Sequence, residues 1–300
     1  MLSFLPVFIL FPLNILLQLF NMLIWASIII LLGLLKLLLP VKPIQNIMHK
    51  GLDWCLNNFG RISVACINLT NNPHWDVEIE GELKKDDWYL LLSNHMSWVD
   101  IFLITQFSAA RIPASKYFVK QELLWVPFIG MGCWALDMPF MKRYSRSFVE
   151  KHPHLKGKDI ASTRKACEKF KKIPTTIVNF VEGSRYTEEK RQRRKSPYQN
   201  LLQPKAGGIA FTLASMGELF SNLIDFTIVF PDNPNHVMYQ MLCGRLKTVV
   251  IRARVLPLTD NLMGDYFNDD GFKQQFQLWL NQLWQHKDKQ IQQINQTYGK

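Results

Sequence analysis

The strongest constraint on how this chain folds is its uncharged N-terminal segment. No charged side chain occurs in residues 2–35, which are rich in leucine, isoleucine and phenylalanine. This segment is longer than the roughly 20 apolar residues that cross a bilayer. It lacks the basic start, short apolar core and small-residue cleavage site of a secretory signal. We therefore predict that it is retained as a membrane anchor.

Prolines and flanking charges predict the arrangement of the anchor. Pro6 and Pro12 interrupt its beginning, whereas the apolar block runs most cleanly over about residues 15–39, which favours one tilted span after a kinked interfacial piece. A re-entrant hairpin is the alternative. Lysines follow the span and no charged side chain precedes it, so the positive-inside bias predicts that the remaining chain lies in the cytoplasm.

The formal net charge of +11 indicates an anionic partner. The basic run at 190–195 lacks the interleaved aromatic residues of a nucleic-acid platform, so we predict a lipid-facing loop, membrane lipids as partners and no nucleic acid. Basic groups near an anionic leaflet gain about 1 kcal/mol each. The five cysteines are scattered, without metal-ligand spacing, which predicts reduced thiols and no metal site.

Hydrophobic patterning divides the chain into four parts. These are a membrane anchor (1–40), an interfacial helical segment (41–73), an α/β domain (74–260) and a C-terminal amphipathic helix with a polar tail (261–300). Strand-like runs occur at 76–81, 88–93, 175–180, 225–230 and 248–255, and a helix with Asp159 as N-cap is expected at 159–172. The apolar stripe from Phe272 to Trp284 predicts a packed terminal helix.

The alternation of strands and helices between 74 and 260 predicts the fold class. We expect an α/β domain with a mixed, mostly parallel sheet flanked by helices, preceded by the N-terminal transmembrane or interfacial helical segment. Ligands of such sheets bind at the carboxyl ends of the strands. Polar residues that directly follow the predicted strands are therefore the candidates for a functional site.

The sequence SNHMSWVD at 93–100 follows one of these strands directly. His95 and Asp100 are five residues apart and do not share a face of one helix, so they meet only if His95 lies on the turn before it. Two interpretations remain open. Ser97 and Asp100 can form a capping box, or the Asp100 carboxylate can fix the imidazole tautomer so that the other ring nitrogen accepts a substrate proton.

Cationic residues follow the apolar run that ends in PFM. Lys142 and Arg143 stand at this point, and the planar guanidinium of arginine suits a phosphate. A solvated positive end of a strand or helix is the alternative interpretation.

The strand at 175–180 delivers four further candidates to a turn. Glu182, Gly183, Ser184 and Arg185 suit a glycerol phosphate, because a carboxylate can hold hydroxyls while a guanidinium binds phosphate and glycine permits close approach. An ordinary polar turn with an ion pair is the alternative. Lys205 opens the next helix and can add a phosphate donor, although a simple helix start explains it equally well.

Taken together, the motifs NHMSWVD, PFMKR and FVEGSR resemble the glycerolipid acyltransferase family, which includes lysophosphatidic acid acyltransferases. The similarity spans about 88–231, and the segments WVPFIGMGCWALDMPFMKRYSR and TTIVNFVEGSR look like a bacterial inner-membrane branch. The third motif often reads FPEGTRS, whereas Val181, Ser184 and Tyr186 stand at three of its positions here. The usual fourth motif is represented only by FPDNP from Phe230. These departures leave the acceptor open.

The resemblance implies roles for individual residues. His95 would be the general base and Asp100 its orienting partner, while Arg143, Glu182, Gly183 and Arg185 would bind the glycerol phosphate of the acceptor.

The resemblance also implies the reaction. An acyl group would pass from acyl-CoA or acyl carrier protein to a lysophospholipid, with 1-acyl-glycerol-3-phosphate favoured as acceptor and phosphatidic acid as product, and without a metal or prosthetic group. The alternatives are another acceptor such as lysophosphatidylglycerol, a hydrolase that uses the same histidine, and a non-catalytic lipid-binding membrane protein.

Overall fold

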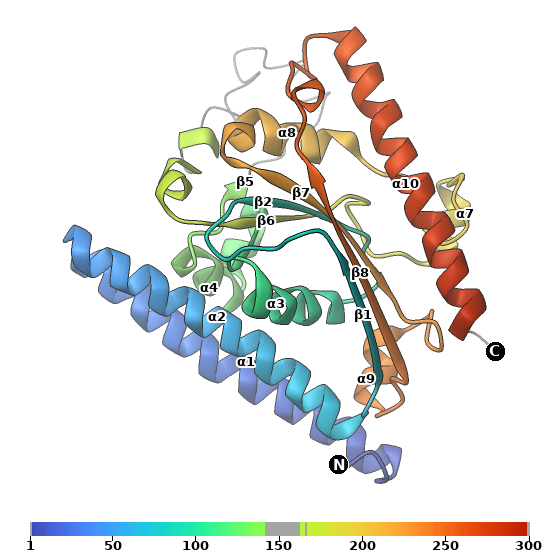
Figure 1. Cartoon of the computed structure of the whole chain (residues 1–300). Coiled ribbons are helices and arrows are strands. Elements are labelled where there is room, and N and C mark those ends of the chain that lie inside the picture. The colour runs from blue at the N-terminus through green and yellow to red at the C-terminus, as the bar shows by residue number, and fades with distance from the viewer. Residues whose placement is uncertain (1, 142–162, 166, 299–300) are drawn as a thin grey trace.

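The centre of the molecule is a six-stranded sheet with helices on both faces, in a computed structural model that describes residues 2–141, 163–165 and 167–298 (Figure 1). The strand order is β1-β8-β7-β2-β6-β3. The strands are β1 (His74–Glu80), β2 (Tyr89–Ser93), β3 (Ser115–Tyr117), β6 (Thr176–Phe180), β7 (Asn222–Val229) and β8 (Thr248–Pro257).

The strand directions confirm a mixed, mostly parallel sheet. β7, β2, β6 and β3 are parallel, β8 pairs antiparallel with β7, and β1 runs parallel to β8. Every residue of β2 is buried, as expected for a strand covered on both faces. All five predicted strands form. β3 and the pair β4 (Val119–Lys120) and β5 (Phe140–Met141) were not predicted, because two or three residues are too few to show an alternating pattern.

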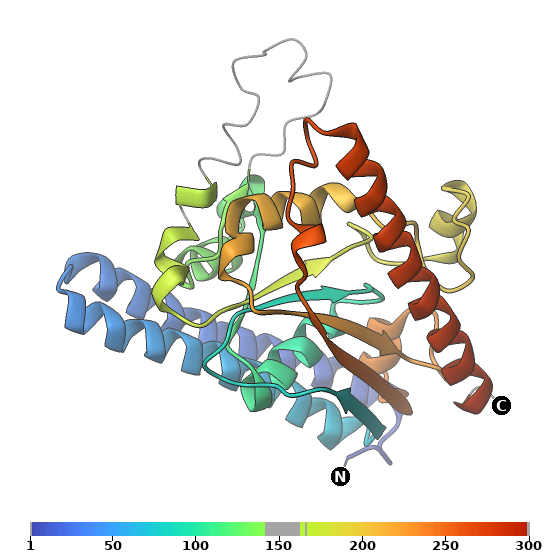
Figure 2. The same ribbon diagram turned by 45° about the horizontal axis from the view of Figure 1, so that its top comes forward.

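Helices cover the two faces of the sheet (Figure 2). One face packs against α2 (Lys42–Thr70), α3 (Val99–Arg111) and α9 (Val237–Leu242), and the other against α8 (Ala206–Met216) and α10 (Asp270–Tyr298). Shorter elements are η1 (Gln121–Trp125), α4 (Ile129–Ala135), η3 (Glu168–Lys172), α7 (Glu188–Arg193), η4 (Gly217–Leu219) and η5 (Asp260–Leu262). Of the helix expected at 159–172, Asp159 lies outside the described residues and the last turn is η3.

The C-terminal helix α10 extends beyond the predicted stripe. It continues to Tyr298, and Ile291 and Ile294 are buried in the same hydrophobic cluster as Trp284, Ile177 and other sheet residues. The segment predicted as a polar tail is therefore mostly helix, and α10 shares the core of the α/β domain.

The N-terminal segment forms one long helix, α1 (Val7–Leu38), which packs along α2 (Figure 1). The helix continues through Pro12, so the separate kinked piece expected before Ile15 does not form. Proline removes one backbone donor near the helix start. Packing of α1 against α2 and α9 offsets that loss.

The inner face of α1 carries amide side chains. Asn14 Nδ2 donates to the carbonyl of Leu242 at 3.0 Å, and Asn21 Nδ2 donates to Ser63 Oγ at 2.9 Å. Gln18 Nε2 donates to the carbonyl of Ser63 at 3.1 Å. Amides in an otherwise apolar helix fix which face contacts its neighbours, because leaving them without partners is costly. The amide face of α1 is thus directed to the folded domain.

The C-terminal end of α1 contacts the domain as well. Lys36 Nζ lies 2.5 Å from Asp137 Oδ2, and His49 Nδ1 of α2 lies 3.2 Å from the same oxygen. Gly33 packs directly against Ala135 of α4. Both ends of α1 are therefore held by the domain.

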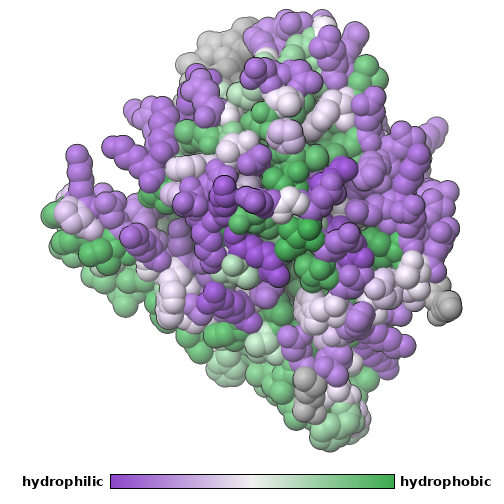
Figure 3. Space-filling model, in the orientation of Figure 1, coloured by the Kyte–Doolittle hydropathy of each residue, from purple (hydrophilic) through white to green (hydrophobic). Residues whose placement is uncertain are grey.

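The outer face of α1 is apolar and exposed. It carries Phe8, Ile9, Ile15, Leu16, Leu19, Phe20, Ile24, Ile28, Leu31, Leu34, Leu35, Leu37 and Leu38. Figure 3 shows apolar residues gathered along the edge formed by α1 and α2. Within the described part of the chain, α1 is the one helix long and apolar enough to cross a membrane.

We expect Gly33→Ala to loosen the contact between α1 and α4. A Cβ at Gly33 would lie 2.4 Å from Ala135 Cβ and 3.0 Å from its Cα, so the helices must separate, at a cost of about 1–3 kcal/mol. Thermal unfolding in detergent measures the change. Gly132→Ala is the control, because a Cβ there meets no atom within 4 Å. Equal melting temperatures for Gly33→Ala and the parent would contradict this packing.

Candidate active site

Two of the predicted motifs lie side by side at the carboxyl edge of the sheet. Ser93 at the end of β2 pairs with Phe180 at the end of β6, so the segments that follow these strands are neighbours. The backbone N–H of Tyr186 donates to the carbonyl of His95 at 2.7 Å and links the two segments. This is the edge at which open α/β sheets bind ligands.

His95 lies on the turn between β2 and α3, where it meets Asp100. His95 Nδ1 lies 2.8 Å from Asp100 Oδ2, and the same oxygen accepts from the backbone N–H of Met96 at 2.7 Å and of Ser97 at 2.9 Å. The carboxylate thereby assigns the proton to Nδ1 and leaves Nε2 as the acceptor. The structure brings the predicted pair together.

The same carboxylate also caps α3. The helix begins at Val99, one residue later than a Ser97 N-cap requires, and Ser97 Oγ accepts from the Val99 N–H at 3.3 Å. Asp100 reaches back to the Ser97 N–H, which is the reciprocal half of a capping box. Capping and orientation of the imidazole therefore occur together, as one oxygen serves both.

Asp100 is fully buried, and burial raises the pKa of its carboxyl group. The hydrogen bonds from His95, Ser97 and Met96 act in the opposite direction, since they favour the charged form. A buried carboxylate that keeps three donors is well suited to stabilise an imidazolium cation.

Aromatic rings pack against the imidazole of His95. The His95 ring stacks on Phe180 with 3.9 Å between ring centroids, and the Tyr117 ring is stacked with Phe180 at a centroid distance of 6.1 Å. Asn94, which precedes His95, donates to the carbonyl of Ile228 and accepts from its N–H, each at 2.9 Å. The His95 turn is thus fastened to both β6 and β7.

The turn after β6 carries the predicted acidic and glycine residues. Glu182 is fully buried, and neither carboxylate oxygen has a hydrogen-bond partner of normal geometry among the described residues. Burial raises the pKa of Glu182 well above its usual value, and the charge of Asp100 adds to this. Gly183 has a φ of +66°, a conformation that favours glycine. Ser184 Oγ is also buried without a partner in this part of the chain.

Two cationic candidates lie around this turn. Arg185 is exposed, and its guanidinium lies 5.0 Å from the centroid of the Trp98 ring, beside the His95 turn. Lys205 precedes α8, and its side chain lies against Gly183. The structure therefore gathers Glu182, Gly183, Ser184, Arg185 and Lys205 near His95. Lys142 and Arg143 lie outside the described residues, so their predicted part in the site stays a prediction.

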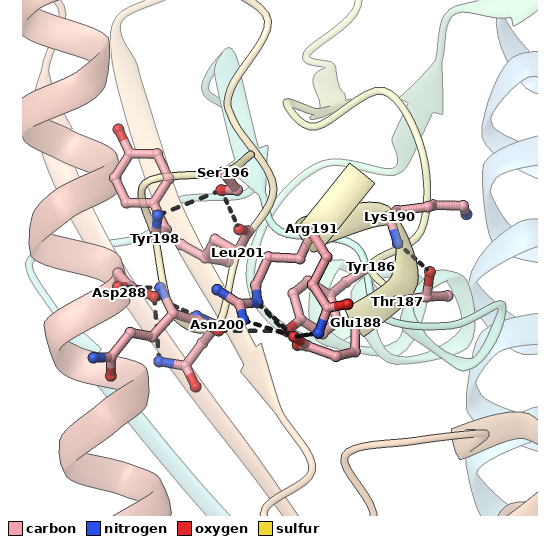
Figure 4. Close-up of polar contacts among 12 residues, drawn as sticks. Tyr186, Thr187, Glu188, Lys190, Arg191, Ser196, Tyr198, Asn200, Leu201 and Asp288 are labelled. Atoms are coloured by element: carbon pink, nitrogen blue, oxygen red, sulfur yellow. Dashed lines mark hydrogen bonds and ion pairs between the residues drawn. The ribbon is translucent and has the colours of Figure 1, made fainter. Parts of the chain in front are cut away.

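The basic run at 190–195 was predicted as a loop, but its residues up to Arg193 lie on helix α7, whose polar contacts are shown in Figure 4. Glu188 bonds Arg191 at 2.6 Å and accepts from Tyr186 Oη at 2.9 Å. The pairing with Arg191 lowers the pKa of Glu188 to about 2. Asp288 of α10 accepts from the backbone N–H of Asn200 at 2.8 Å. The segment after the Glu182 turn is thus anchored by α10.

A pocket of about 280 Å³ lies beside the site, lined by residues such as Asn94, Tyr186, Asn200 and Asn295. Three of the amides that line it are already hydrogen-bonded within the protein: Asn94 bonds Ile228, and Asn200 bonds both Asp288 and Asn295. We therefore do not assign it a ligand. Within the described ranges no group of histidine, cysteine and acidic residues could hold a metal ion, and Cys55, Cys66, Cys133 and Cys243 are free thiols.

Some site residues were not identified from the sequence. Phe180, Asn94 and Trp98 lie inside the quoted motifs, but nothing in their spacing indicated stacking or a link to β7. Lys287 of α10 is fully buried. Its position on the apolar face of the helix, between Trp284 and Ile291, is the sequence feature that could have predicted this burial.

The comparisons with known proteins identify the class. The Acyltransferase family matches residues 74–229. The 1-acyl-sn-glycerol-3-phosphate acyltransferase 3 of Arabidopsis thaliana is 27% identical over 248 residues, covering 76% of this chain and 58% of the plant protein. The 1-acyl-sn-glycerol-3-phosphate acyltransferase delta of Homo sapiens is 26% identical over 182 residues, covering 58% of this chain and 44% of that protein.

A second type of acceptor occurs among the relatives. The 2-acyl-1-lysophosphatidylinositol acyltransferase of Saccharomyces cerevisiae is 21% identical over 243 residues, covering 69% of this chain and 61% of the yeast protein. The chain spans about half the length of the curated relatives that it matches.

A solved structure shares the fold. The 1-acyl-sn-glycerophosphate (LPA) acyltransferase PlsC of Thermotoga maritima has a TM-score of 0.54 at 16% identity, covering 94% of this chain and 95% of that one.

The chain belongs to the Acyltransferase family, since that family matches more than half of its length. Within it, the chain is similar to proteins named as 1-acyl-sn-glycerol-3-phosphate acyltransferases and shares the fold of one of them. The narrower assignment to a bacterial inner-membrane branch remains a prediction.

We expect Asp100→Asn to separate the two roles of this carboxylate. Loss of the negative charge weakens the hold on the Nδ1 proton, so acyl transfer should fall by about 10²–10⁴, the range of general acid–base help. Ser97→Ala is the control, because it removes a cap contact only and costs about 1 kcal/mol of stability. Turnover measured with each folded variant shows whether Asp100 contributes to the reaction or only to the stability of α3. If the Asp100→Asn variant is less stable than the parent but equally fast, Asp100 caps α3 and has no role in the reaction.

Proposed function

We propose that this protein transfers a fatty acyl group from a thioester to the free hydroxyl of a lysophospholipid, with 1-acyl-glycerol-3-phosphate as acceptor and phosphatidic acid as product. The observation that carries the proposal is the 2.8 Å contact between His95 and the buried Asp100 at the carboxyl edge of the sheet, with the Glu182 turn beside it. The relatives named for 1-acyl-sn-glycerol-3-phosphate support this acceptor.

The proposed chemistry is direct transfer. His95 Nε2 takes the proton of the acceptor hydroxyl while that oxygen attacks the thioester carbonyl. Asp100 stabilises the imidazolium that forms. As the tetrahedral intermediate collapses, the carbon–sulfur bond breaks and the imidazolium returns its proton to the leaving thiolate. This sequence of bond changes and proton transfers needs no acyl-enzyme and no metal ion.

The acceptor phosphate is assigned to the cations of the site. Arg185 is exposed next to Trp98, and Lys205 lies against Gly183, so both cations flank the Glu182 turn. Lys142 and Arg143 are proposed to complete the binding site for the phosphate. The donor is proposed to be acyl-CoA or acyl carrier protein, which present the same thioester.

Replacing His95 with alanine tests the reaction. His95→Ala removes the only base in this scheme, so transfer of a labelled acyl group from acyl-CoA or acyl carrier protein to lysophosphatidate should fall by at least about 10²–10⁴. The fold should persist, since the imidazole is partly exposed and Asp100 keeps its two backbone donors. An undiminished rate in a folded variant would overturn the mechanism.

The same assay separates the competing functions. A panel of lysophosphatidate, lysophosphatidylglycerol and lysophosphatidylinositol identifies the acceptor, the last because of the yeast relative. A hydrolase would release free fatty acid whether or not acceptor is present. A lipid-binding protein would retain labelled lipid and release no product.

We also propose that the enzyme works at the cytoplasmic face of the inner membrane, with the exposed side of α1 in the lipid. A second apolar surface supports this placement. Trp125 of η1 is 84% exposed, and Phe128, Ile129 and Met131 near the start of α4 are also exposed. Because α4 packs against the C-terminal end of α1, the two apolar surfaces are neighbours. Tryptophan prefers the membrane–water interface.

Removing this second surface should weaken membrane binding. We expect Trp125→Ser with Phe128→Ser to lower the bound fraction in cosedimentation with vesicles of anionic phospholipid, because each loses about 1.5–3 kcal/mol of apolar burial if the side chain is immersed. Leu278→Ser is the control, since Leu278 is exposed on α10 away from α1. If the double variant and the control bind vesicles equally, η1 and α4 do not enter the lipid.

A further inference from the structure

One face of the His95 imidazole is covered by the ring of Phe180, the last residue of β6. The two ring centroids are 3.9 Å apart and the ring planes are inclined by 19°, so the rings lie nearly parallel. Asp100 occupies the Nδ1 edge of the imidazole. Substrate can therefore reach this ring only at its Nε2 edge or at its opposite face.

The Phe180 ring is itself held by the sheet and by a second ring. Its backbone ends β6 and pairs with Ser93 at the end of β2. The ring of Tyr117 is stacked with it, again with 19° between the planes, at a centroid distance of 6.1 Å. Tyr117 belongs to β3, which pairs with β6. Phe180 therefore has little freedom to turn away from the imidazole.

The stacked ring acts differently on the two charge states of the imidazole. The face of an aromatic ring is negative, and a cation within about 6 Å of its centroid is attracted to it. A neutral imidazole gains only the ordinary contact between stacked rings. In the proposed transfer His95 is neutral before the reaction and becomes an imidazolium as the acceptor oxygen attacks. An interaction that is stronger in the charged state lowers the barrier.

We propose that Phe180 is a positioning residue for acyl transfer, which fixes the plane of the His95 imidazole and stabilises the imidazolium through the face of its own ring. The inference rests on the proposed function, because it needs His95 as the base. Phe180 complements Asp100, since the carboxylate meets the imidazole at its Nδ1 edge and Phe180 covers its face. The two side chains thus stabilise the same cation from different directions.

Fluorinated phenylalanines in place of Phe180 in the full chain test the charge effect. Fluorine withdraws electron density from the ring face and nearly keeps the shape of the ring, so each added atom weakens the attraction for a cation. We expect the single-turnover rate at saturating substrate to fall stepwise from the mono- to the di- and trifluorinated ring. The total loss should be about 2- to 30-fold, which is about 0.5–2 kcal/mol at 1.36 kcal/mol per tenfold. The substrate concentrations that give half of the maximal rate should not change.

Three controls accompany the series. The same fluorinated residues in place of Phe272, whose ring packs 5.9 Å from that of Phe276 in α10, should leave the rate unchanged. Phe180→Leu keeps an apolar side chain and removes the ring, so it should slow transfer at least as much as the trifluorinated ring. In a His95→Ala background the trifluorinated ring should have no further effect on the residual transfer, because the imidazole through which Phe180 acts is absent.

The outcomes are distinct. A rate that falls with each fluorine at Phe180, without a further loss in the His95→Ala background, supports the proposal. Equal rates along the series overturn it even if Phe180→Leu is slow, because a ring that only fills space is insensitive to fluorine. A further loss in the His95→Ala background also overturns it. If Phe180→Leu does not fold, the fluorinated series still gives the answer. A parent enzyme that transfers no acyl group, or a His95→Ala variant as fast as the parent, refutes the proposed function instead.

Discussion

One oxygen of a buried carboxylate organises the active site. Asp100 Oδ2 accepts from the imidazole of His95 and from two backbone N–H groups of the turn that carries it. Because the same atom starts α3 and orients the imidazole, the local fold and the chemistry cannot vary independently. The His95 turn is in turn fastened to β7 by Asn94 and to the Glu182 turn by the N–H of Tyr186. A general base on a loop is positioned well only when its surroundings are fixed in this way.

The charged groups of the site differ in their access to solvent. The imidazole, stacked on Phe180, is partly exposed and the guanidinium of Arg185 is exposed, whereas Asp100, Glu182 and Lys287 are fully buried. The accessible groups can meet substrate, and the buried groups can act on them only through the protein interior. A low-dielectric interior makes each such charge more effective and each missing partner more costly.

Much of this could be predicted from the sequence, for reasons that differ between elements. The strands at 88–93 and 175–180 were predictable because burial on both faces requires continuous apolar runs, and the pairing of Ser93 with Phe180 then brings two motifs together. The start of α3 was misplaced by one residue because the Asp100 carboxylate bonds the turn as well as the helix. The extent of α10 was underestimated, since Lys287 interrupts its apolar stripe and only the partners on β7 explain a lysine there. The four predicted site residues of the Glu182 turn could be grouped from one motif, whereas the stacking of His95 on Phe180 depends on a register that no local pattern contains.

The contacts at both ends of α1 have a consequence for how this enzyme meets its substrates. Asn14 bonds the carbonyl of Leu242 near one end of α1 and Lys36 pairs with Asp137 near the other, so α1 is held against the domain along its length and is not a flexible tether. If α1 enters the bilayer as we propose, His95 therefore keeps a fixed height and tilt relative to the lipid headgroups. A lysolipid acceptor would then have to rise only as far as that height, and its acyl tail could stay in the bilayer during the proposed transfer.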